Sequence, residues 1–429
     1  MTSSPAIGNK LINTPRQVLF ASLVGTAVEF FDFYIYATAA VLVFPKLFFP
    51  KSDPASSVLA SLATFAIAFV ARPIGSALFG HFGDRIGRKR TLVLALLTMG
   101  ISTFVIGTLP SYHAIGIAAP VLLAFCRFGQ GIGLGGEWGG AVLLAVENAP
   151  PSKRAFYGMF PQLGAPLGFL LSGGIFLALS RWLTDAQFFA FGWRLPFLAS
   201  AVLVLLGLYV RLSITETPVF ESAMKKARPA QVPIAEVFRR HTRDVIAGIL
   251  VCMATFVLFY LMTVFALSWG TTALHYPRAE FLVMQLIAVV FFGATIPLSA
   301  WMAERGRRPV MFGVSFLIAV FGLFMARMFA AGPTGALWMM SLGLALMGIT
   351  YGPLGTVVSE LFPTPVRYTG SSLAFSMAGI LGASLAPYIA TWLAESFGLA
   401  YVGYYLSASA VLSILGLLMI RETSGEELK

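Results

Sequence analysis

Charge is scarce in this chain. Charged residues make up only 11% of its 429 residues, against about 25% in ordinary soluble domains. Hydrophobic residues make up 58%, and the mean hydropathy is +0.84. Too few polar side chains are available to cover a water-facing surface. The composition therefore excludes an ordinary soluble protein and predicts an integral membrane protein.

Residues that bind metals or form disulfides are also rare. The two cysteines, Cys126 and Cys252, both fall in apolar runs, so we interpret them as buried hydrophobic side chains. Of the four histidines, His81 and His275 lie near predicted span ends, which disfavours a histidine proton relay in the membrane. No Walker A pattern is present. We expect no metal, no cofactor and no direct use of ATP.

The alternating pattern of a membrane β-barrel is missing, so helices are the spanning elements that we expect. Apolar runs long enough to cross a hydrocarbon core of about 30 Å recur along the whole chain. The first run is too long for the core of a signal peptide and is expected to stay as an uncleaved anchor. We predict twelve spans, at 17–46, 55–80, 91–109, 115–146, 155–180, 190–212, 244–270, 279–302, 309–330, 335–360, 368–395 and 399–421.

The net charge of +11 is distributed unevenly between the two ends of these spans. Most of the 29 Lys and Arg fall at the end that holds both termini, which the positive-inside rule assigns to the cytoplasm. The basic charge then reports topology and anionic lipid, and we expect a bilayer and no nucleic acid as partner. The six basic residues at the other end are Lys46, Lys51, Arg181, Arg194, Arg278 and Arg327.

The two halves of the chain echo each other. A polar, basic stretch at 213–243 divides the spans six and six, which predicts an N-terminal bundle at 1–212, a cytoplasmic linker and a C-terminal bundle at 244–429. An acid and an arginine stand seven apart after spans 4 and 10: Glu147 with Arg154, and Glu360 with Arg367. We predict an all-α membrane protein of twelve transmembrane helices in two pseudo-symmetric six-helix bundles, with a cavity between them.

Five ionisable residues lie well inside predicted spans, and all are in the first half, whereas the spans of the second half carry charges only near their ends. The five are Glu29, Asp32, Arg72, Arg127 and Glu137. A charge at the bilayer centre costs at least about 2.5–3.5 kcal/mol, so such residues mark function. Glu29, Asp32 and Tyr36 share one helix face, and two close carboxyls in a low dielectric cannot both ionise cheaply. Either carboxyl is a candidate proton carrier, with Glu137 and Arg72 as further coupling candidates. The alternative is a static ion pair with Arg72 that ties two helices together.

Span 4 carries Arg127 and Gln130 three residues apart, with Glu137 two turns further on. The planar guanidinium can bind a carboxylate through two parallel hydrogen bonds, so Arg127 and Gln130 are candidate substrate ligands. Arg127 could instead only neutralise Asp32 or Glu137. Further polar or aromatic substrate candidates are Tyr36, Trp138, Gln162, Gln285 and Tyr388, although an aromatic in a helix more often serves packing.

Span 4 also contains Gly131-Ile-Gly133-Leu-Gly135-Gly136, which formally matches the dinucleotide fingerprint GxGxxG. We reject a nucleotide site, because no strand precedes the motif and it lies within a span. Glycines at 131, 135 and 139 have the small-xxx-small spacing that lets membrane helices pack closely. The sequence therefore predicts a close helix contact along this face.

Co-linear motifs along nearly the whole chain resemble those of one transporter family. The stretch Gly80-His-Phe-Gly-Asp-Arg-Ile-Gly-Arg-Lys-Arg90 resembles the loop motif of the major facilitator superfamily, and Arg127-Phe-Gly-Gln130-Gly-Ile-Gly133 resembles its second motif. Within the superfamily, four stretches are similar to the metabolite:proton symporters: Glu29-Phe-Phe-Asp32-Phe-Tyr34, Arg72-Pro-Ile-Gly75, Gly135-Gly-Glu-Trp-Gly-Gly140 and Leu361-Phe-Pro-Thr-Pro-Val-Arg367. That family carries shikimate, citrate and other carboxylates, alpha-ketoglutarate, and proline or betaine. The chain ends soon after Arg421, without the coiled coil of osmosensing members, so we expect no osmosensing role.

The resemblance implies a gate on the cytoplasmic side. Gly83 and Gly87 would allow a tight turn between spans 2 and 3. By resemblance, the loop would latch onto Glu147 and Arg154, and a matching latch would form in the second half; the alternative is that the basic residues only hold the loops inside. The remaining residues of the two latches are Asp84, Arg85, Arg88, Glu304, Arg305, Glu360 and Arg367.

These observations predict a monomeric, multi-pass transporter of the inner membrane that is not an enzyme, with both termini cytoplasmic. We expect it to import a small organic acid, such as a mono- or dicarboxylate or a shikimate-like acid, together with a proton by alternating access. A rival hypothesis is uptake of a zwitterion such as betaine or proline, whose cation would lie over an aromatic face. A membrane enzyme, a sensor or a channel is less favoured, because no catalytic cluster and no attached soluble domain are evident.

Overall fold

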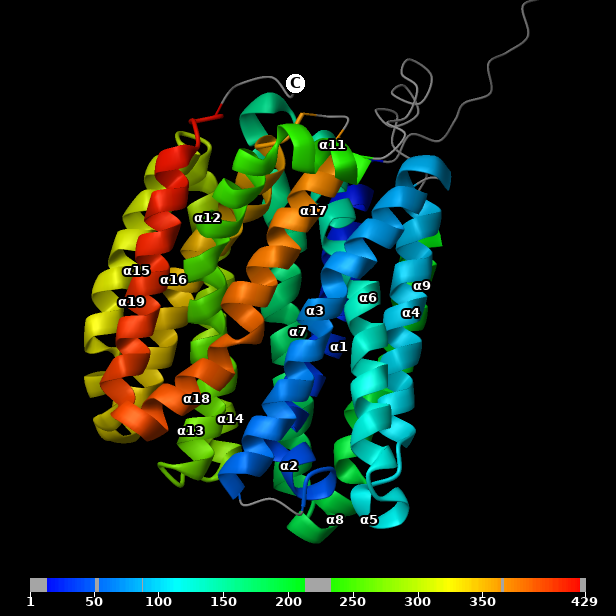
Figure 1. Ribbon diagram of the computed structural model, residues 1–429, viewed down its shortest axis with the longest axis vertical. Coiled ribbons are helices and arrows are strands. Elements are labelled where there is room, and N and C mark those ends of the chain that lie inside the picture. Colours follow the sequence, from blue (N-terminus) through cyan, green and yellow to red (C-terminus); the bar gives the residue numbers. More distant parts are fainter. Residues whose placement is uncertain (1–13, 51–53, 87, 213–232, 364–365, 425–429) are drawn as a thin grey trace, which may run out of the picture.

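The computed structural model describes residues 14–50, 54–86, 88–212, 233–363 and 366–424. Within these residues, twelve helices are long and apolar enough to cross a membrane, and no strand is present (Figure 1). The predicted all-α membrane fold is confirmed. In the first half, the spanning helices are α1 (Pro15–Leu42), α3 (Pro54–Ile86), α4 (Arg88–Thr108), α6 (Ala118–Glu147), α7 (Arg154–Trp182) and α9 (Leu195–Leu212).

In the second half, two of the six spans are interrupted by a π-helical turn. One consists of α12 (Thr242–Tyr260), η3 (Leu261–Phe265) and α13 (Ala266–Thr272). The other consists of α17 (Arg367–Ala378), η5 (Gly379–Ser384) and α18 (Ala386–Phe397). The remaining spans are α14 (Arg278–Ala303), α15 (Arg307–Ala330), α16 (Gly332–Glu360) and α19 (Leu399–Met419). Short connecting helices are α2 (Phe44–Leu47), α5 (Tyr112–Ile115), η1 (Pro151–Lys153), α8 (Asp185–Ala190), η2 (Gly192–Arg194) and α11 (Pro233–Arg240).

Local residue chemistry sets several helix ends. Thr14 caps α1 in a capping box with Gln17, and Pro15 occupies the first helical position, where its missing N–H costs nothing. The predicted first span runs to residue 46, but α1 ends at Leu42, because Pro45 cannot continue the helix and instead lies in the first turn of α2. Helix α3 runs on to Ile86, so the turn expected at Gly83 is wrong: residue 83 is helical.

The packing order of the helices shows the pseudo-symmetry directly. In the first half α3 packs on α6, and α9 packs on both α4 and α1. The second half repeats this arrangement, with α14 on α16 and α19 on both α15 and α12. The halves meet along two equivalent seams, α7 with α14 and α17 with α3, which are exchanged by the pseudo-twofold relation. These two seams bound the space between the halves in which the cavity is predicted.

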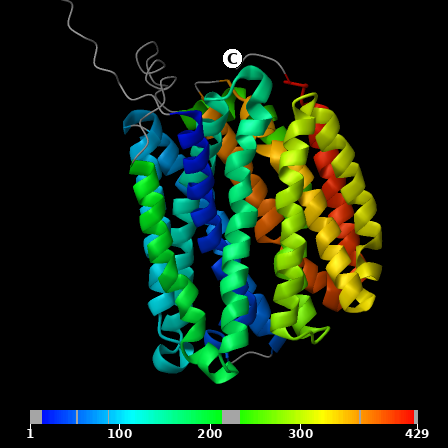
Figure 2. The same cartoon turned by 180° about the vertical axis from the view of Figure 1, so that it is seen from behind.

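The two ends of the bundle differ. One end, which we call the α11 end, carries α11, the start of α1 and the end of α19 (Figure 1). The opposite end, the α8 end, carries α2, α5 and α8, and the view from behind shows the same separation (Figure 2). Large apolar side chains such as Phe125, Val202 and Phe316 are exposed on the flank between the ends, as expected for a surface that contacts lipid.

Candidate functional site

The glycines of α6 bring that helix onto its neighbours. A side chain at Gly131 would collide with the backbone at Ala68 of α3, and one at Gly135 would collide with the α3 backbone at Arg72 and Ser76. A side chain at Gly139 would strike Ser372 of α17 in the other half. The close contact predicted from the small-xxx-small spacing is confirmed, and it holds Arg72 next to α6.

Asp32 faces the interior of the first half and is held there by hydrogen bonds. Its Oδ1 accepts a hydrogen bond of 2.5 Å from Ser200 of α9. A polar chain approaches it from α6: Arg127 Nη1 donates to Gln130 Oε1 at 2.9 Å, and Gln130 Nε2 donates to Thr103 Oγ1 at 2.7 Å. The side-chain hydroxyl of Thr103 in turn interacts with the Asp32 carboxyl. Asp32 is therefore bonded to α9 through Oδ1, whereas its Oδ2 has no hydrogen-bond partner and its carboxyl makes no ion pair among the described residues.

Glu29 has a different environment, although it lies only one turn away. It is fully buried, and neither carboxyl oxygen has a hydrogen-bond partner among the described residues. It lines a small central cavity of about 20 Å³ between the halves, together with Arg72. The two residues form no ion pair in this conformation within the described part of the chain. The structure therefore does not show the static ion pair that the sequence left as an alternative. The cavity has room for about one water molecule, so it must expand to admit a metabolite.

Arg127 lies inside the first half and does not border the central cavity. Its guanidinium carbon is 4.5 Å from the ring centre of Phe33, 4.0 Å from that of Tyr36 and 4.8 Å from that of Phe65. These cation–π contacts compensate a buried charge that forms no ion pair among the described residues. The role of Arg127 as a substrate ligand stays a prediction, whereas Arg72 already faces the space between the halves.

Glu137 pairs with a residue that sequence reasoning missed. Arg211, on the last turn of α9, makes a direct ion pair with Glu137, and both side chains are more than nine-tenths buried. From the sequence, Arg211 looked like one of the basic residues at the cytoplasmic end of a span. Its spacing from a buried acid on another helix is invisible in one sequence, and only the packing of α9 on the bundle brings them together.

The other polar candidates divide into four groups. Trp138 and Gln162 bridge the halves, because Trp138 Nε1 donates to Gln162 Oε1 at 3.2 Å and Gln162 Nε2 donates to the Tyr351 carbonyl at 3.0 Å. Gln285 donates to the Thr263 carbonyl at 2.7 Å and so satisfies the π-helical turn in span 7. Tyr36 is bonded to Thr64 at 2.8 Å within the first half. Tyr388 is 42% exposed and does not line the central cavity, so the structure does not place it with the site.

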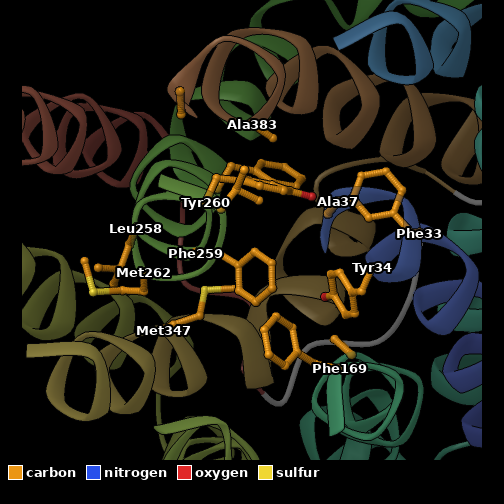
Figure 3. Packing of buried hydrophobic residues seen from close by; sticks show 14 of the residues in the cluster. Phe33, Tyr34, Ala37, Phe169, Leu258, Phe259, Tyr260, Met262, Met347 and Ala383 are labelled. Atoms are coloured by element: carbon orange, nitrogen blue, oxygen red, sulfur yellow. The ribbon is translucent and has the colours of Figure 1, made fainter. Parts of the chain in front are cut away.

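Aromatic rings close the central cavity toward the α8 end. Figure 3 shows Phe33 and Tyr34 of α1, Phe169 of α7 and Phe259 and Tyr260 of α12 converging from both halves. Tyr34 lies 5.5 Å from Phe259 and 5.2 Å from Phe169 between ring centres. Beyond this layer, at the α8 end, lies a larger cavity of about 660 Å³ whose lining includes Val41, Trp269 and Glu395.

The halves are sealed toward the α11 end. Trp138 stacks on Phe375 with ring centres 3.6 Å apart, and the Tyr368 hydroxyl donates to the Gly136 carbonyl at 2.7 Å. Ser76 and Ser376 are bonded across the interface at 3.1 Å. The conformation is therefore occluded at its centre, closed toward the α11 end and hollowed at the α8 end.

An ion-pair cluster lies beyond this seal. Glu360 of α16 lies 3.2 Å from Arg307 of α15 and 3.9 Å from Arg154 of α7, so it joins the halves. Glu304 also crosses the interface by accepting a hydrogen bond of 2.8 Å from the Phe156 N–H. Partial burial raises the pKa of Glu304 above its usual value. We call this cluster of Glu304, Glu360, Arg154 and Arg307 the latch. It contains Arg307 in place of the predicted Arg305, which is exposed and lies over Trp301.

The other predicted latch residues are less fully described. Arg367 is buried and donates through Nε to the Phe362 carbonyl at 3.0 Å, and Glu147 is half-buried at the end of α6. Gly87 lies outside the described residues, and so do the side chains of Asp84, Arg85 and Arg88. Their part in the latch stays a prediction.

The C-terminal segment after α19 reinforces this cluster. Glu422 accepts hydrogen bonds from the backbone N–H groups of Arg307 and Arg308 at 3.1 and 2.8 Å, at the start of α15. Partial burial alone would raise the pKa of Glu422, but the backbone hydrogen bonds outweigh it and hold the pKa below its usual value. Thr423 donates to Glu360 at 2.6 Å and Ser424 donates to the Glu304 carbonyl at 2.7 Å. The segment therefore holds both acids of the latch.

The contact between the halves at the α8 end is weaker. Arg278 of α14 pairs with Asp185 of α8 at 3.0 Å, but Asp185 is 82% exposed. Exposed pairs contribute about 0–1 kcal/mol, whereas breaking a buried pair costs about 3–5 kcal/mol. The energetic balance therefore favours closure at the α11 end and easier opening at the α8 end.

Comparison with known proteins decides the family. A family model described as Major Facilitator Superfamily matches residues 22–387. This chain belongs to the Major Facilitator Superfamily. It is 56% identical over 424 residues to the inner membrane metabolite transport protein YhjE of Escherichia coli K12, covering 97% of this chain and 96% of that protein. The family and these relatives make the chain a multi-pass metabolite transporter.

Other transporters are less similar to the chain in sequence. The chain is 36% identical to the shikimate transporter of Escherichia coli K12, covering 99% of this chain and 98% of the transporter. It is 32% identical to the proline/betaine transporter of the same organism, with coverages of 96% and 85%. Among solved structures, the xylose transporter XylE from E. coli in a partially occluded inward open conformation superposes with a TM-score of 0.75 at 18% identity, covering 96% of this chain and 99% of XylE. That likeness confirms the major facilitator fold.

The latch at the α11 end gives a first testable expectation for this superfamily member. In a Glu360→Gln variant, Arg154 and Arg307 lose their shared carboxylate, and the occluded state loses about 3–5 kcal/mol of stability. We expect the α11 end to open more often. A Ser376→Cys reporter, which is buried at the seal, should then react faster with a thiol reagent.

A matched control is Glu280→Gln, which removes an exposed acid at the start of α14, at the α8 end. The native Cys126 and Cys252 are buried and provide the background rate in a variant without the reporter. Equal labelling in Glu360→Gln and Glu280→Gln would show that the ion-pair cluster does not hold the α11 end closed.

Proposed function

We propose that this transporter is a proton-coupled symporter of a small organic acid in the inner membrane, working by alternating access. The α11 end, with both termini, would face the cytoplasm, as the distribution of Lys and Arg favours. The names of its relatives, which include an inner membrane metabolite transport protein and a shikimate transporter, agree with this proposal.

One observation carries the proposal: Glu29 and Arg72 face the same central cavity, and neither carboxyl oxygen of Glu29 has a hydrogen-bond partner among the described residues. A buried ion is stable only if an opposite charge or hydrogen bonds compensate it. Arg72 is the cation that this cavity offers to both Glu29 and an incoming carboxylate. The two anions therefore compete for one guanidinium.

This competition would couple substrate binding to the protonation of Glu29. When an organic anion binds Arg72, an ionised Glu29 would be a second negative charge in the same low-dielectric cavity. Protonation of Glu29 removes that repulsion, so the substrate anion and one proton bind together. The loaded site then has the same net charge as the empty one, which lets the halves close over either form. On this reading Glu29 carries the proton, and Asp32, bonded to Ser200, orders the polar chain inside the first half.

The moving units would be the two bundles at 1–212 and 244–429, joined by the linker at 213–243. Closure at the α11 end and the hollow at the α8 end correspond to a state that takes substrate from outside through the cavity of about 660 Å³. The aromatic layer around Tyr34 and Phe259 would separate to admit the substrate. Opening of the Glu360 latch would then release it to the cytoplasm.

The aromatic lining supports a second candidate, the uptake of a zwitterion such as betaine or proline. Phe33, Tyr34, Phe259 and Tyr260 line the central cavity beside Arg72. A quaternary or secondary ammonium could lie over these rings while its carboxylate binds the guanidinium. Proline/betaine transporters are also among the relatives, at lower identity than the shikimate transporter.

Uptake by purified protein in liposomes tests the proposal. Radiolabelled shikimate, citrate, alpha-ketoglutarate, betaine and proline should be offered with and without an inward proton gradient, over protein-free vesicles as a control. Accumulation of an acid only under the gradient supports organic-acid symport, whereas accumulation of betaine or proline supports the second candidate. Equal uptake with and without the proton gradient would exclude proton coupling.

A further inference from the structure

The pair of Arg211 and Glu137 lies deep in the first half, away from the latch. Arg211 reaches inward from the last turn of α9 and contacts Oε1 of Glu137 on α6 through Nη2. The Glu137 residue is 1% exposed, so water cannot replace its partner. Among the described residues of the first half, this is the direct ion pair that joins two spanning helices.

The missing side chain of Gly25 makes room for this guanidinium. A Cβ at residue 25 would lie 2.6 Å from Nη2 of Arg211. Gly25 precedes Glu29 by one helical turn on α1, so the two positions share a face. Arg211 therefore lies against α1 one turn from Glu29 while it contacts Glu137.

The charges around Glu29 come from several packed helices. Glu137 on α6, Arg72 on α3 and Arg211 on α9 all interact electrostatically with Glu29. The phenols of Tyr34 on α1, Tyr260 on α12 and Tyr351 on α16 line the same cavity as Glu29. Three buried carboxyls, those of Glu29, Asp32 and Glu137, thus share one region with two guanidiniums, and of these carboxyls Glu137 has direct contact with a cation.

We infer that Arg211 is a positioning residue that decides which carboxyl is protonated: by its direct contact it keeps Glu137 ionised and leaves Glu29 as the group that gains and loses the proton. A guanidinium stays charged at any working pH, so protonating Glu137 would leave a buried cation uncompensated. Glu29 has no such direct contact. The assignment of Glu29 rests on the proposed function, whereas the ionised state of Glu137 does not.

Infrared difference titration of the purified protein tests this inference without any substrate, because protonated carboxyls absorb separately from carboxylates. In the native chain we expect a titrating band of a buried carboxyl that Glu29→Gln removes; a band of the equally buried Asp32 is recognised by its loss in Asp32→Asn. In Arg211→Gln we expect an additional protonated band, which should disappear in the double variant with Glu137→Gln. Arg211→Lys, which keeps the charge, should restore the native spectrum.

Further variants keep the inference testable if Arg211→Gln fails to fold. Gly25→Ala displaces the guanidinium and should give the same additional band, whereas its matched control Gly174→Ala, on α7 with open space around the new Cβ, should not. In the single Glu137→Gln variant the freed Arg211 should move the Glu29 band to lower pH without abolishing it.

The absence of an additional band in Arg211→Gln and in Gly25→Ala, or its persistence in the double variant, would overturn the inference. If the native chain lacks a band that Glu29→Gln removes, the proposed proton carrier fails, while the result for Arg211 and Glu137 still stands on its own.

Discussion

Replacing Glu29 by Gln is expected to abolish accumulation of the substrate under a proton gradient while leaving exchange of substrate across the membrane intact. A glutamine has the shape of the protonated carboxyl, so the site can bind the anion at Arg72 and close, but no proton is carried. A gradient of one pH unit is worth about 1.4 kcal/mol per proton, which supports about ten-fold accumulation in a one-proton symporter. The accumulation ratio should therefore fall from about ten to about one.

The measurement is uptake of the acid found in the liposome screen, at equal external concentration, with a gradient and with internal unlabelled acid. Glu280→Gln, an exposed acid at the α8 end, is the matched control and should accumulate substrate as the native chain does. Asp32→Asn separates the two candidate carriers. If Asp32→Asn loses accumulation but keeps exchange, and Glu29→Gln accumulates normally, then Asp32 is the carrier and the assignment of Glu29 is wrong.

Replacing Arg72 by Gln should weaken binding of the substrate carboxylate. The guanidinium offers a pair of charge-assisted hydrogen bonds, and hydrogen bonds to charged groups contribute about 1.5–3 kcal/mol. The half-saturation concentration should therefore rise by about 10–100-fold. Arg72→Lys keeps the charge but not the fork, and we expect an intermediate affinity.

Concentration dependence of exchange is the appropriate measurement, because exchange does not require net proton movement. The matched control is Arg327→Gln, an exposed arginine in the last turn of α15. Arg127→Gln tests the role predicted from the sequence. An affinity lost in Arg127→Gln and unchanged in Arg72→Gln would place the substrate carboxylate at Arg127, inside the ring cluster of Phe33, Tyr36 and Phe65, and not in the central cavity.

The occluded conformation links these two residues to the latch. The central cavity has room for about one water molecule, so substrate binding requires the aromatic layer around Tyr34 to separate. At the other end the Glu360 cluster and the contacts of Glu422 hold the halves together. The weaker, exposed contact of Asp185 makes the α8 end the easier one to open.

The sequence by itself determined the membrane class, the number of spans and the two-bundle plan. Hydrophobic length and the repeated motifs are local properties, so they survive without knowledge of the contacts between helices. It also singled out Glu29, Asp32, Arg72, Arg127 and Glu137, because a buried charge is costly wherever the helix lies. Span ends shifted by a few residues where a proline or glycine, such as Pro45 or Gly116, interrupts the helix.

Only the tertiary structure decided which of these charges face each other. Glu29 and Asp32 are one turn apart, yet one lines the cavity between the halves and the other bonds to Ser200 inside the first half. Arg211 and Arg307 looked like ordinary basic span ends, and each proved to neutralise a buried acid on another helix. No local spacing in the sequence encodes these long-range pairs. Glu137 and Arg211 come from different helices, and contacts along the whole length of each helix set its rotation and its depth in the bundle.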